Sequence, residues 1–179
     1  DGQTGSLDRL ARACHELGAG LGLSPTQAEA LELGARLHDI GQVGTPDAVL
    51  AHRGPLRPAE RAVLEQHPVA GAEILETVPL LTPALDVVGA HHERWDGGGY
   101  PEGLRGEEIP LVARVFAVVD TLDALTHDRP YRRACEVPDA LAMVAAESGK
   151  QFDPRVIAAA LAIPAARWTE LLLERAVTS

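Results

Sequence analysis

Residues 109–125 read IPLVARVFAVVDTLDAL, and this apolar segment decides the fold class of the chain. Its length exceeds that of an ordinary strand, and Pro110 stands in a first turn, where a helix tolerates proline. The inner run Val-Phe-Ala-Val-Val by itself could form a strand, but the whole segment favours a buried helix. Asp120 near the middle of that helix is unusual, because a buried carboxylate without a partner costs several kcal/mol.

Outward from this segment, the rest of the chain also has helical spacing. Ser24-Pro25 is a typical helix start, with an N-cap serine followed by proline at the first helical position. No stretch alternates polar and apolar residues around a hairpin turn. We predict one all-α domain over residues 1–179, a bundle of about seven to nine helices with a glycine-rich loop at 96–106. The other helices are predicted at 7–21, 25–39, 58–76, 80–92, 137–148, 154–162 and 164–176, and a loop at 45–57.

The composition restricts the function and the location. The chain has 179 residues, 46% of them hydrophobic, and a net charge of −10, which argues against DNA and anionic membranes as partners. No apolar run approaches the ~18–20 residues of a membrane span, and no signal peptide is visible. Cys14 and Cys135 form no CxxC pair, which favours a reducing, cytoplasmic setting. The sequence begins without Met, so we expect a fragment of a longer signalling protein.

Candidate metal ligands occur in four groups. They are His38-Asp39, His67, His91-His92 and Asp120. Imidazole and carboxylate without thiolate suit Fe, Mn or Zn better than a structural zinc site. Adjacent helix residues point about 100° apart, so two ions ~3.5–4 Å apart suit these pairs better than one ion does.

Each group taken alone has an ordinary alternative. A histidine before a proline, like His67, is more often a residue on a helix face, and Asp120 could pair with an arginine or cap a helix. Together, on separate predicted helices, the groups predict a site with about six ligands for two metals.

The motifs resemble a known family, the HD-GYP domains, a branch of the HD metal-dependent phosphohydrolases. The resemblance rests on LHDIG at 37–41, HHERWDGGGYP at 91–101 and VVDTLDALTHDRPYRRA at 118–134. Shorter matches occur in the same order, namely GTP at 44–46, HP at 67–68, GEEIP at 106–110 and QFDP at 151–154. The resemblance covers residues 6–161.

This resemblance implies hydrolysis of cyclic di-GMP to linear pGpG, and on to GMP, by a two-metal site in a bacterial signalling protein. The expected metals are Fe or Mn, with Zn, Ni and Mg as alternatives. An upstream sensor or receiver domain, a protein signalling partner and a homodimer are further expectations. The implied substrate-binding residues are Gly99, Tyr100, Arg129 and Arg132. The implied metal ligands are His38, Asp39 (which would also be catalytic, as the bridging ligand), His67, His91, His92 and Asp120.

Two positions depart from the family pattern. Gln42 stands where the family has a catalytic lysine, and Ser6 stands where it has an early histidine. A glutamine can donate a hydrogen bond but neutralises no charge, and losing one preorganised stabilising group typically costs ~10²–10³ in rate. Both departures predict reduced activity.

Three functions therefore stay open: an active phosphodiesterase, an impaired domain that binds metal, with or without cyclic di-GMP, and signals through partners, and an HD phosphohydrolase of mononucleotides. The GGGYP loop and the DRPYR run argue against the third.

Overall fold

A computed structural model describes residues 2–52, 54–128 and 133–173 of the chain. This part contains α-helices, short 3-10 helices and no strand, so the prediction of an all-α bundle is confirmed. Apart from the single turn α3, nine α-helices are present in these residues. The α-helices are α1 (Gly2–Gly20), α2 (Pro25–Leu37), α3 (Asp47–Leu50), α4 (Pro58–Leu64), α5 (His67–Glu76), α6 (Leu85–Ala90), α7 (Leu111–Thr126), α8 (Val137–Ala146), α9 (Pro154–Ala162) and α10 (Ala165–Leu173). The 3-10 helices are η1 (Ile40–Gly44), η2 (Pro79–Ala84) and η3 (Gly106–Glu108).

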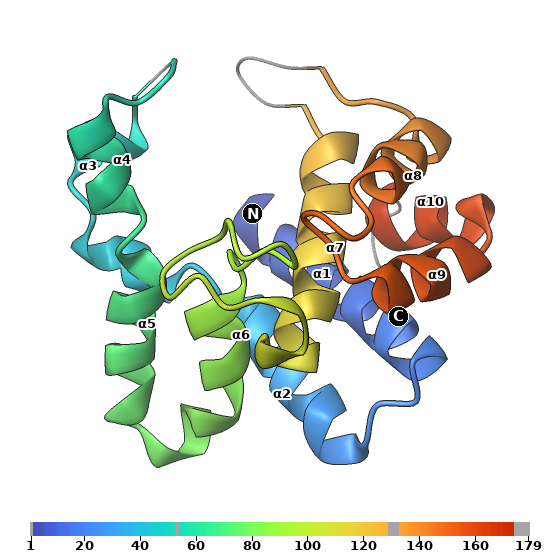
Figure 1. The fold of residues 1–179 in the computed structure, drawn as a ribbon, viewed down its shortest axis with the longest axis horizontal. Helices are drawn as coiled ribbons and strands as arrows, with labels where there is room; N and C mark the ends of the chain where they lie inside the picture. Colours follow the sequence, from blue (N-terminus) through green and yellow to red (C-terminus); the bar gives the residue numbers. More distant parts are fainter. Residues whose placement is uncertain (1, 53, 129–132, 174–179) are drawn as a thin grey trace.

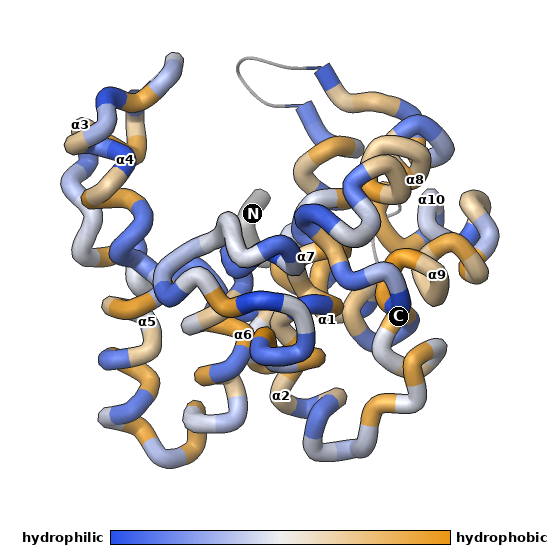
Figure 2. The backbone as a smooth tube through the Cα atoms, in the orientation of Figure 1, coloured by the Kyte–Doolittle hydropathy of each residue, from blue (hydrophilic) through white to orange (hydrophobic). Residues whose placement is uncertain are grey.

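Helix α7 is the buried helix that the sequence predicts, and it lies at the centre of the fold. In Figure 1 it lies between α5 and α6 on one side and α8, α9 and α10 on the other, and it also contacts α1 and α2. In Figure 2 the hydrophobic segments of α8, α9 and α10 lie beside it. The side chains of Val115, Phe116, Val119 and Leu122 are fully buried, and each such burial contributes roughly 1.5–3 kcal/mol. This apolar packing fixes the helix that carries Asp120.

Local sequence signals set the helix starts. Ser24 caps α2 in a capping box with Gln27, and the Asp153 side chain accepts a hydrogen bond from the Arg155 amide at 2.7 Å to cap α9. Such caps satisfy amides that have no partner within the helix, and proline at the first position costs nothing there.

The predicted single helix over 58–76 is wrong, because α4 ends at Leu64 and α5 begins at His67. Pro68 has no amide hydrogen to continue α4, whereas it fits the first turn of a new helix. The break places His67 at a helix start. The predicted loop at 45–57 contains α3, and the predicted helix over 80–92 is divided into η2 and α6. Helices α3 and α4 bury no residue and project from the bundle (Figure 1).

Two glycines allow the segment after α2 to lie directly on α5. A Cβ atom added to Gly41 would stand 2.0 Å from the His67 carbonyl oxygen and 2.5 Å from the Gly71 amide nitrogen. Gly71 in turn faces Val88 of α6, which would be 2.7 Å from an added Cβ. These contacts bring Asp39, two residues before Gly41, next to His67.

No single described helix is both long enough and apolar enough to cross a membrane. Helices α9 and α10 reach that length and hydropathy only together, across a bend of 94°.

Candidate metal centre

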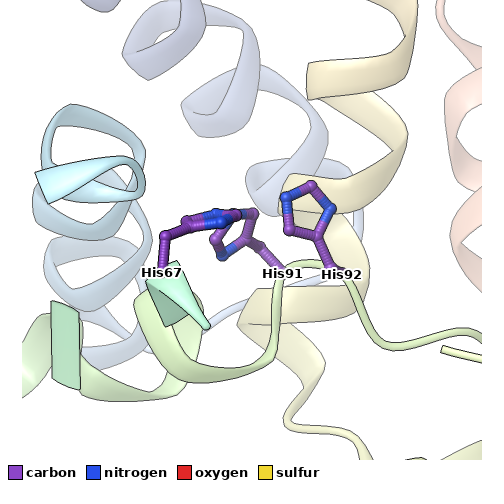
Figure 3. A group of neighbouring side chains, drawn as sticks. All are labelled: His67, His91 and His92. Carbon is purple, nitrogen blue, oxygen red and sulfur yellow. The ribbon is translucent and has the colours of Figure 1, made fainter. Parts of the chain in front are cut away.

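Three of the histidines named from the sequence form a compact cluster. His67 comes from the first turn of α5, and His91 and His92 directly follow α6 (Figure 3). One ring nitrogen from each of the three lies within 4.8 Å of the others, and the Nε2 atoms of His67 and His91 are 3.2 Å apart. Two buried imidazoles are thus held with nitrogen atoms facing each other.

Hydrogen bonds fix which nitrogen of each ring is free. The Nδ1 atom of His67 lies 2.8 Å from the Leu64 carbonyl oxygen, and that of His91 lies 2.9 Å from the Val88 carbonyl oxygen. Since a carbonyl oxygen only accepts, each Nδ1 carries a proton, and in its neutral form each ring turns an Nε2 lone pair inward. This is the orientation that metal-ligating histidines have.

The donor set fits a cation. Two Nε2 lone pairs at 3.2 Å repel each other unless a proton or a metal ion is shared between them. Burial, followed by the charges of His92 and His38, lowers the pKa of His91 well below its usual value, which disfavours the proton. A metal ion satisfies the same lone pairs, and imidazole with carboxylate is a normal ligand set for Fe, Mn and Zn.

Asp39 joins the cluster from the turn between α2 and η1. One of its carboxylate oxygens is 3.3 Å from His38 Nε2, and the other is 3.5 Å from His67 Nε2. Burial alone would raise the pKa of Asp39, but the hydrogen bond and charge of His38, with the charges of His91 and His67, lower it to about 2. A carboxylate that is ionised and faces two imidazoles on different elements is well placed to bridge two ions.

A cavity of about 540 Å³ joins these groups to the second set of candidates. Gln42 lines it from η1, Asp120 from α7, Tyr100 from the glycine-rich loop, and Ser6 from α1. His91 lies behind this wall, at 4% exposure. The full lining is Ser6, Leu7, Leu10, His38, Asp39, Gln42, Leu64, His67, His92, Tyr100, Asp120 and Asp123. Seven of the site residues predicted from the sequence therefore share one cavity, namely His38, Asp39, Gln42, His67, His92, Tyr100 and Asp120.

The glycine-rich loop doubles back onto the end of α6. The Tyr100 ring stacks on the His92 ring, with centroids 4.7 Å apart and planes inclined by 27°. Gly99 has no room for a side chain, because an added Cβ would be 2.4 Å from the Arg94 amide nitrogen and 2.6 Å from the His92 carbonyl oxygen. Gly99 and Tyr100 also line a smaller adjoining cavity of about 180 Å³. The predicted substrate residues Arg129 and Arg132 lie outside the described residues.

Two carboxylates at the site were not assigned a role from the sequence. Asp123, one helical turn after Asp120, lines the cavity and is paired with Arg9 at 2.6 Å. The Nη2 atom of Arg9 donates to the Ser6 hydroxyl at 3.1 Å. Asp123 is buried, and its carboxylate faces α1 through the ion pair with Arg9. Its spacing from Asp120 could have indicated a shared face. The second carboxylate is that of Glu93, which directly follows His92 and is buried.

Acid should destabilise the metal-free protein. Burial, followed by the charges of His67 and His38, lowers the pKa of His92 to about 4, and that of His91 is lowered too. The unfolded chain, with ordinary histidines near 6.5, therefore binds more protons between pH 6.5 and about 4, and stability falls as the pH is lowered through this window. We expect the unfolding free energy to decrease by about 1–2 kcal/mol between pH 7 and pH 5.

Urea unfolding at the two pH values measures this change, with His92→Gln as the comparison. The variant should lose much of the pH dependence. Equal pH dependence in both proteins would contradict a neutral, buried His92.

Known proteins resemble the chain over most of its length. A family model for the HD domain matches residues 2–156. The cyclic di-GMP phosphodiesterase response regulator RpfG of Xanthomonas campestris is 41% identical over 90% of the chain. The 3'3'-cGAMP-specific phosphodiesterase 2 of Vibrio cholerae is 33% identical over 97%. The chain spans 43% and 33% of the lengths of these two relatives. A crystal structure of a cyclic GMP-AMP-specific phosphodiesterase of V. cholerae shares the fold, with a TM-score of 0.70 at 22% identity over 96% of this chain and 49% of that one.

Proposed function

Because the chain belongs to the HD-domain family, in its HD-GYP branch, we propose that it hydrolyses a cyclic dinucleotide. The first candidate is cyclic di-GMP, with linear pGpG and GMP as products. One observation carries the proposal: a single cavity brings together Asp39, His67, His92 and Asp120, with Tyr100 on its wall. In that cavity, the candidate metal-binding side chains and an aromatic ring would face the same bound substrate.

The side chains divide into metal-holding and substrate-orienting groups. His38, Asp39, His67, His91, His92 and Asp120 would hold two divalent metals, with Fe or Mn as the first choice. Such metals, when bound, lower the pKa of water toward neutrality and neutralise phosphate charge.

The protein itself fixes the geometry, because the Nδ1–H groups of His38 and His67 donate to carbonyl oxygens and prevent their rings from turning. Gln42 can donate its amide to a phosphate oxygen, and Tyr100 offers a ring face to a base. Hydrolysis then forms a bond between the water oxygen and phosphorus and breaks the bond to the 3′ oxygen, which leaves with a proton.

The second candidate function is an impaired domain that binds metal and cyclic dinucleotide and acts through a partner. Gln42 and Ser6 both line the cavity, so each departure from the family pattern lies where it would meet a bound metal or substrate. Ser6 is engaged by Arg9, so its hydroxyl offers no equivalent of an imidazole.

A direct assay separates the two functions. Protein loaded with Mn or Fe is incubated with cyclic di-GMP, and separately with 3'3'-cGAMP, and the products are resolved by chromatography. Linear products support the phosphodiesterase. Binding measured by calorimetry without any product supports the impaired domain. The absence of both binding and product would refute both functions.

Restoring the family residues should raise activity. We expect Gln42→Lys to increase turnover by ~10²-fold, since it adds a positive charge beside the reacting phosphate. Ser6→His should tighten metal binding, measured by calorimetry with Mn, because it adds an imidazole to the cavity wall. Val43→Lys is the matched control, since Val43 is the next residue but is 79% exposed. A Gln42→Lys protein no faster than this control would show that the departure is not what limits the rate.

A further inference from the structure

Glu93 is a buried carboxylate directly after the two histidines of the site. Its residue is 4% exposed. One carboxylate oxygen, Oε1, accepts hydrogen bonds from the amides of Glu102 and Gly103, at 2.8 and 3.1 Å. The other oxygen, Oε2, is also buried and has no hydrogen-bond partner in the described residues. Such a group is costly to bury, so its role in the site needs explanation.

The two hydrogen bonds close the loop that carries Tyr100. They tie residues 102 and 103 to residue 93, and within the closed loop the Tyr100 amide donates to the His92 carbonyl oxygen at 3.3 Å. The Tyr100 ring then lies against the His92 ring and on the wall of the cavity. A carboxylate accepting two amides forms stronger hydrogen bonds than a neutral acceptor does.

Glu93 does not reach the large cavity itself. It is absent from the lining of that cavity, Oε1 is occupied by the two amides, and Oε2 is shielded from solvent. Glu93 lines only the smaller adjoining cavity, together with His92, Tyr100 and Asp120. We expect an influence of Glu93 on a ligand in the large cavity to pass through the loop, because Tyr100 of that loop lines the large cavity and stacks on the candidate metal ligand His92.

We propose that Glu93 is a positioning residue: it holds the loop closed so that Tyr100 stays stacked on His92 at the cavity wall. The effect of Glu93 on the binding of a ligand rests on the proposed function, whereas its effect on the stacking of Tyr100 does not. If Glu93 had a purely structural role, its substitution would lower the stability of the protein without a specific change in the surroundings of the His92 ring.

The geometry allows the two roles to be separated. Glu102 and Gly103 are exposed, so amides released by a substitution can bond to water. A methionine at position 93 has a similar length and removes a buried carboxylate. Replacing buried charge by apolar groups of similar volume is often neutral for stability. Glu93→Met should therefore free the loop while the protein stays folded.

The test uses zinc-loaded protein and NMR of the histidine ring protons. In wild-type protein the Tyr100 ring current displaces the His92 ring signals, and Tyr100→Ala gives their position without stacking. We expect Glu93→Met to move these signals most of the way to the Tyr100→Ala position, and hydrogen exchange at the Glu102 and Gly103 amides to accelerate at least ~10-fold. Glu93→Gln keeps an acceptor and should fall between wild type and Glu93→Met.

Glu108→Met is the matched control, because the exposed Glu108 carboxylate accepts one amide, from Arg105, in the same region. This variant should leave the His92 signals unchanged. Unmoved His92 signals in folded Glu93→Met protein would overturn the proposal, as would a Glu93→Met protein that does not fold while Glu93→Gln matches wild type at His92 and in amide exchange.

The ligand arm measures the Kd of cyclic di-GMP by calorimetry. Glu93→Met should weaken binding ~10-fold in the wild-type background. In the Tyr100→Ala background the same substitution should leave the Kd unchanged, because two residues that act through the same path have non-additive effects. If the losses of binding free energy in the two single variants add up in the double variant, Glu93 does not act through Tyr100. If the wild-type protein neither binds nor hydrolyses a cyclic dinucleotide, the proposed function fails, and the NMR and exchange measurements still decide the role of Glu93.

Discussion

Asp39→Asn is expected to lose tightly bound metal and to lower cyclic dinucleotide hydrolysis by at least ~10³-fold. The Asp39 carboxylate contacts His38 and His67 from two different elements, and these histidines, with His91, hold its pKa at about 2, so that it stays ionised at neutral pH. An asparagine has nearly the same shape but carries no charge and presents one oxygen instead of two. It therefore cannot neutralise or bridge two cations.

Elemental analysis after gel filtration measures the metal content, and product chromatography measures the rate. Asp47→Asn is the control, since Asp47 lies eight residues later in α3, is exposed, and does not line the cavity. It should bind metal and turn over like the wild type. If Asp39→Asn keeps its full metal content and turns over like the wild type, the proposed role of Asp39 as a bridging metal ligand is wrong.

Gly41→Ala should destabilise the fold by about 3 kcal/mol or more. The added methyl group would overlap the His67 carbonyl oxygen at 2.0 Å and the Gly71 amide nitrogen at 2.5 Å. Both atoms belong to the backbone of α5, which cannot turn aside as a flexible side chain could. The segment after α2 would have to move away from α5, and Asp39 would move away from His67. Metal affinity should therefore fall together with stability.

Urea unfolding of the metal-free protein measures the stability, and calorimetric titration with Mn measures the affinity. Gly44→Ala provides the matched control in the same 3-10 helix, because an added Cβ at Gly44 meets nothing within 4 Å. Its unfolding free energy should stay within about 0.5 kcal/mol of wild type. If both variants unfold at the urea concentration of the wild type, the close approach of η1 to α5 is not what the fold depends on.

The sequence contained enough local information to predict the helices and the groups of candidate ligands. The apolar segment over 109–125 predicts α7, and Ser24-Pro25 predicts the start of α2, because periodicity and capping depend on residues that are near each other in the chain. The break before His67 was missed although its cause, Pro68, is local. A proline can be read as the first turn of a new helix or as part of a longer one, and neighbouring residues do not decide between these readings.

An all-α chain in which imidazole and carboxylate groups recur at the ends of helices could be predicted from the sequence alone. The folded chain adds that His67 and His91, 24 residues apart, face each other at 3.2 Å. It also pairs Asp123 with Arg9, 114 residues away, and closes the loop of Tyr100 through Glu93. Local patterns cannot contain these contacts, because they depend on packing between elements. In particular, the absence of a side chain at Gly41 lets η1 lie on α5, and no periodicity along the chain records that approach.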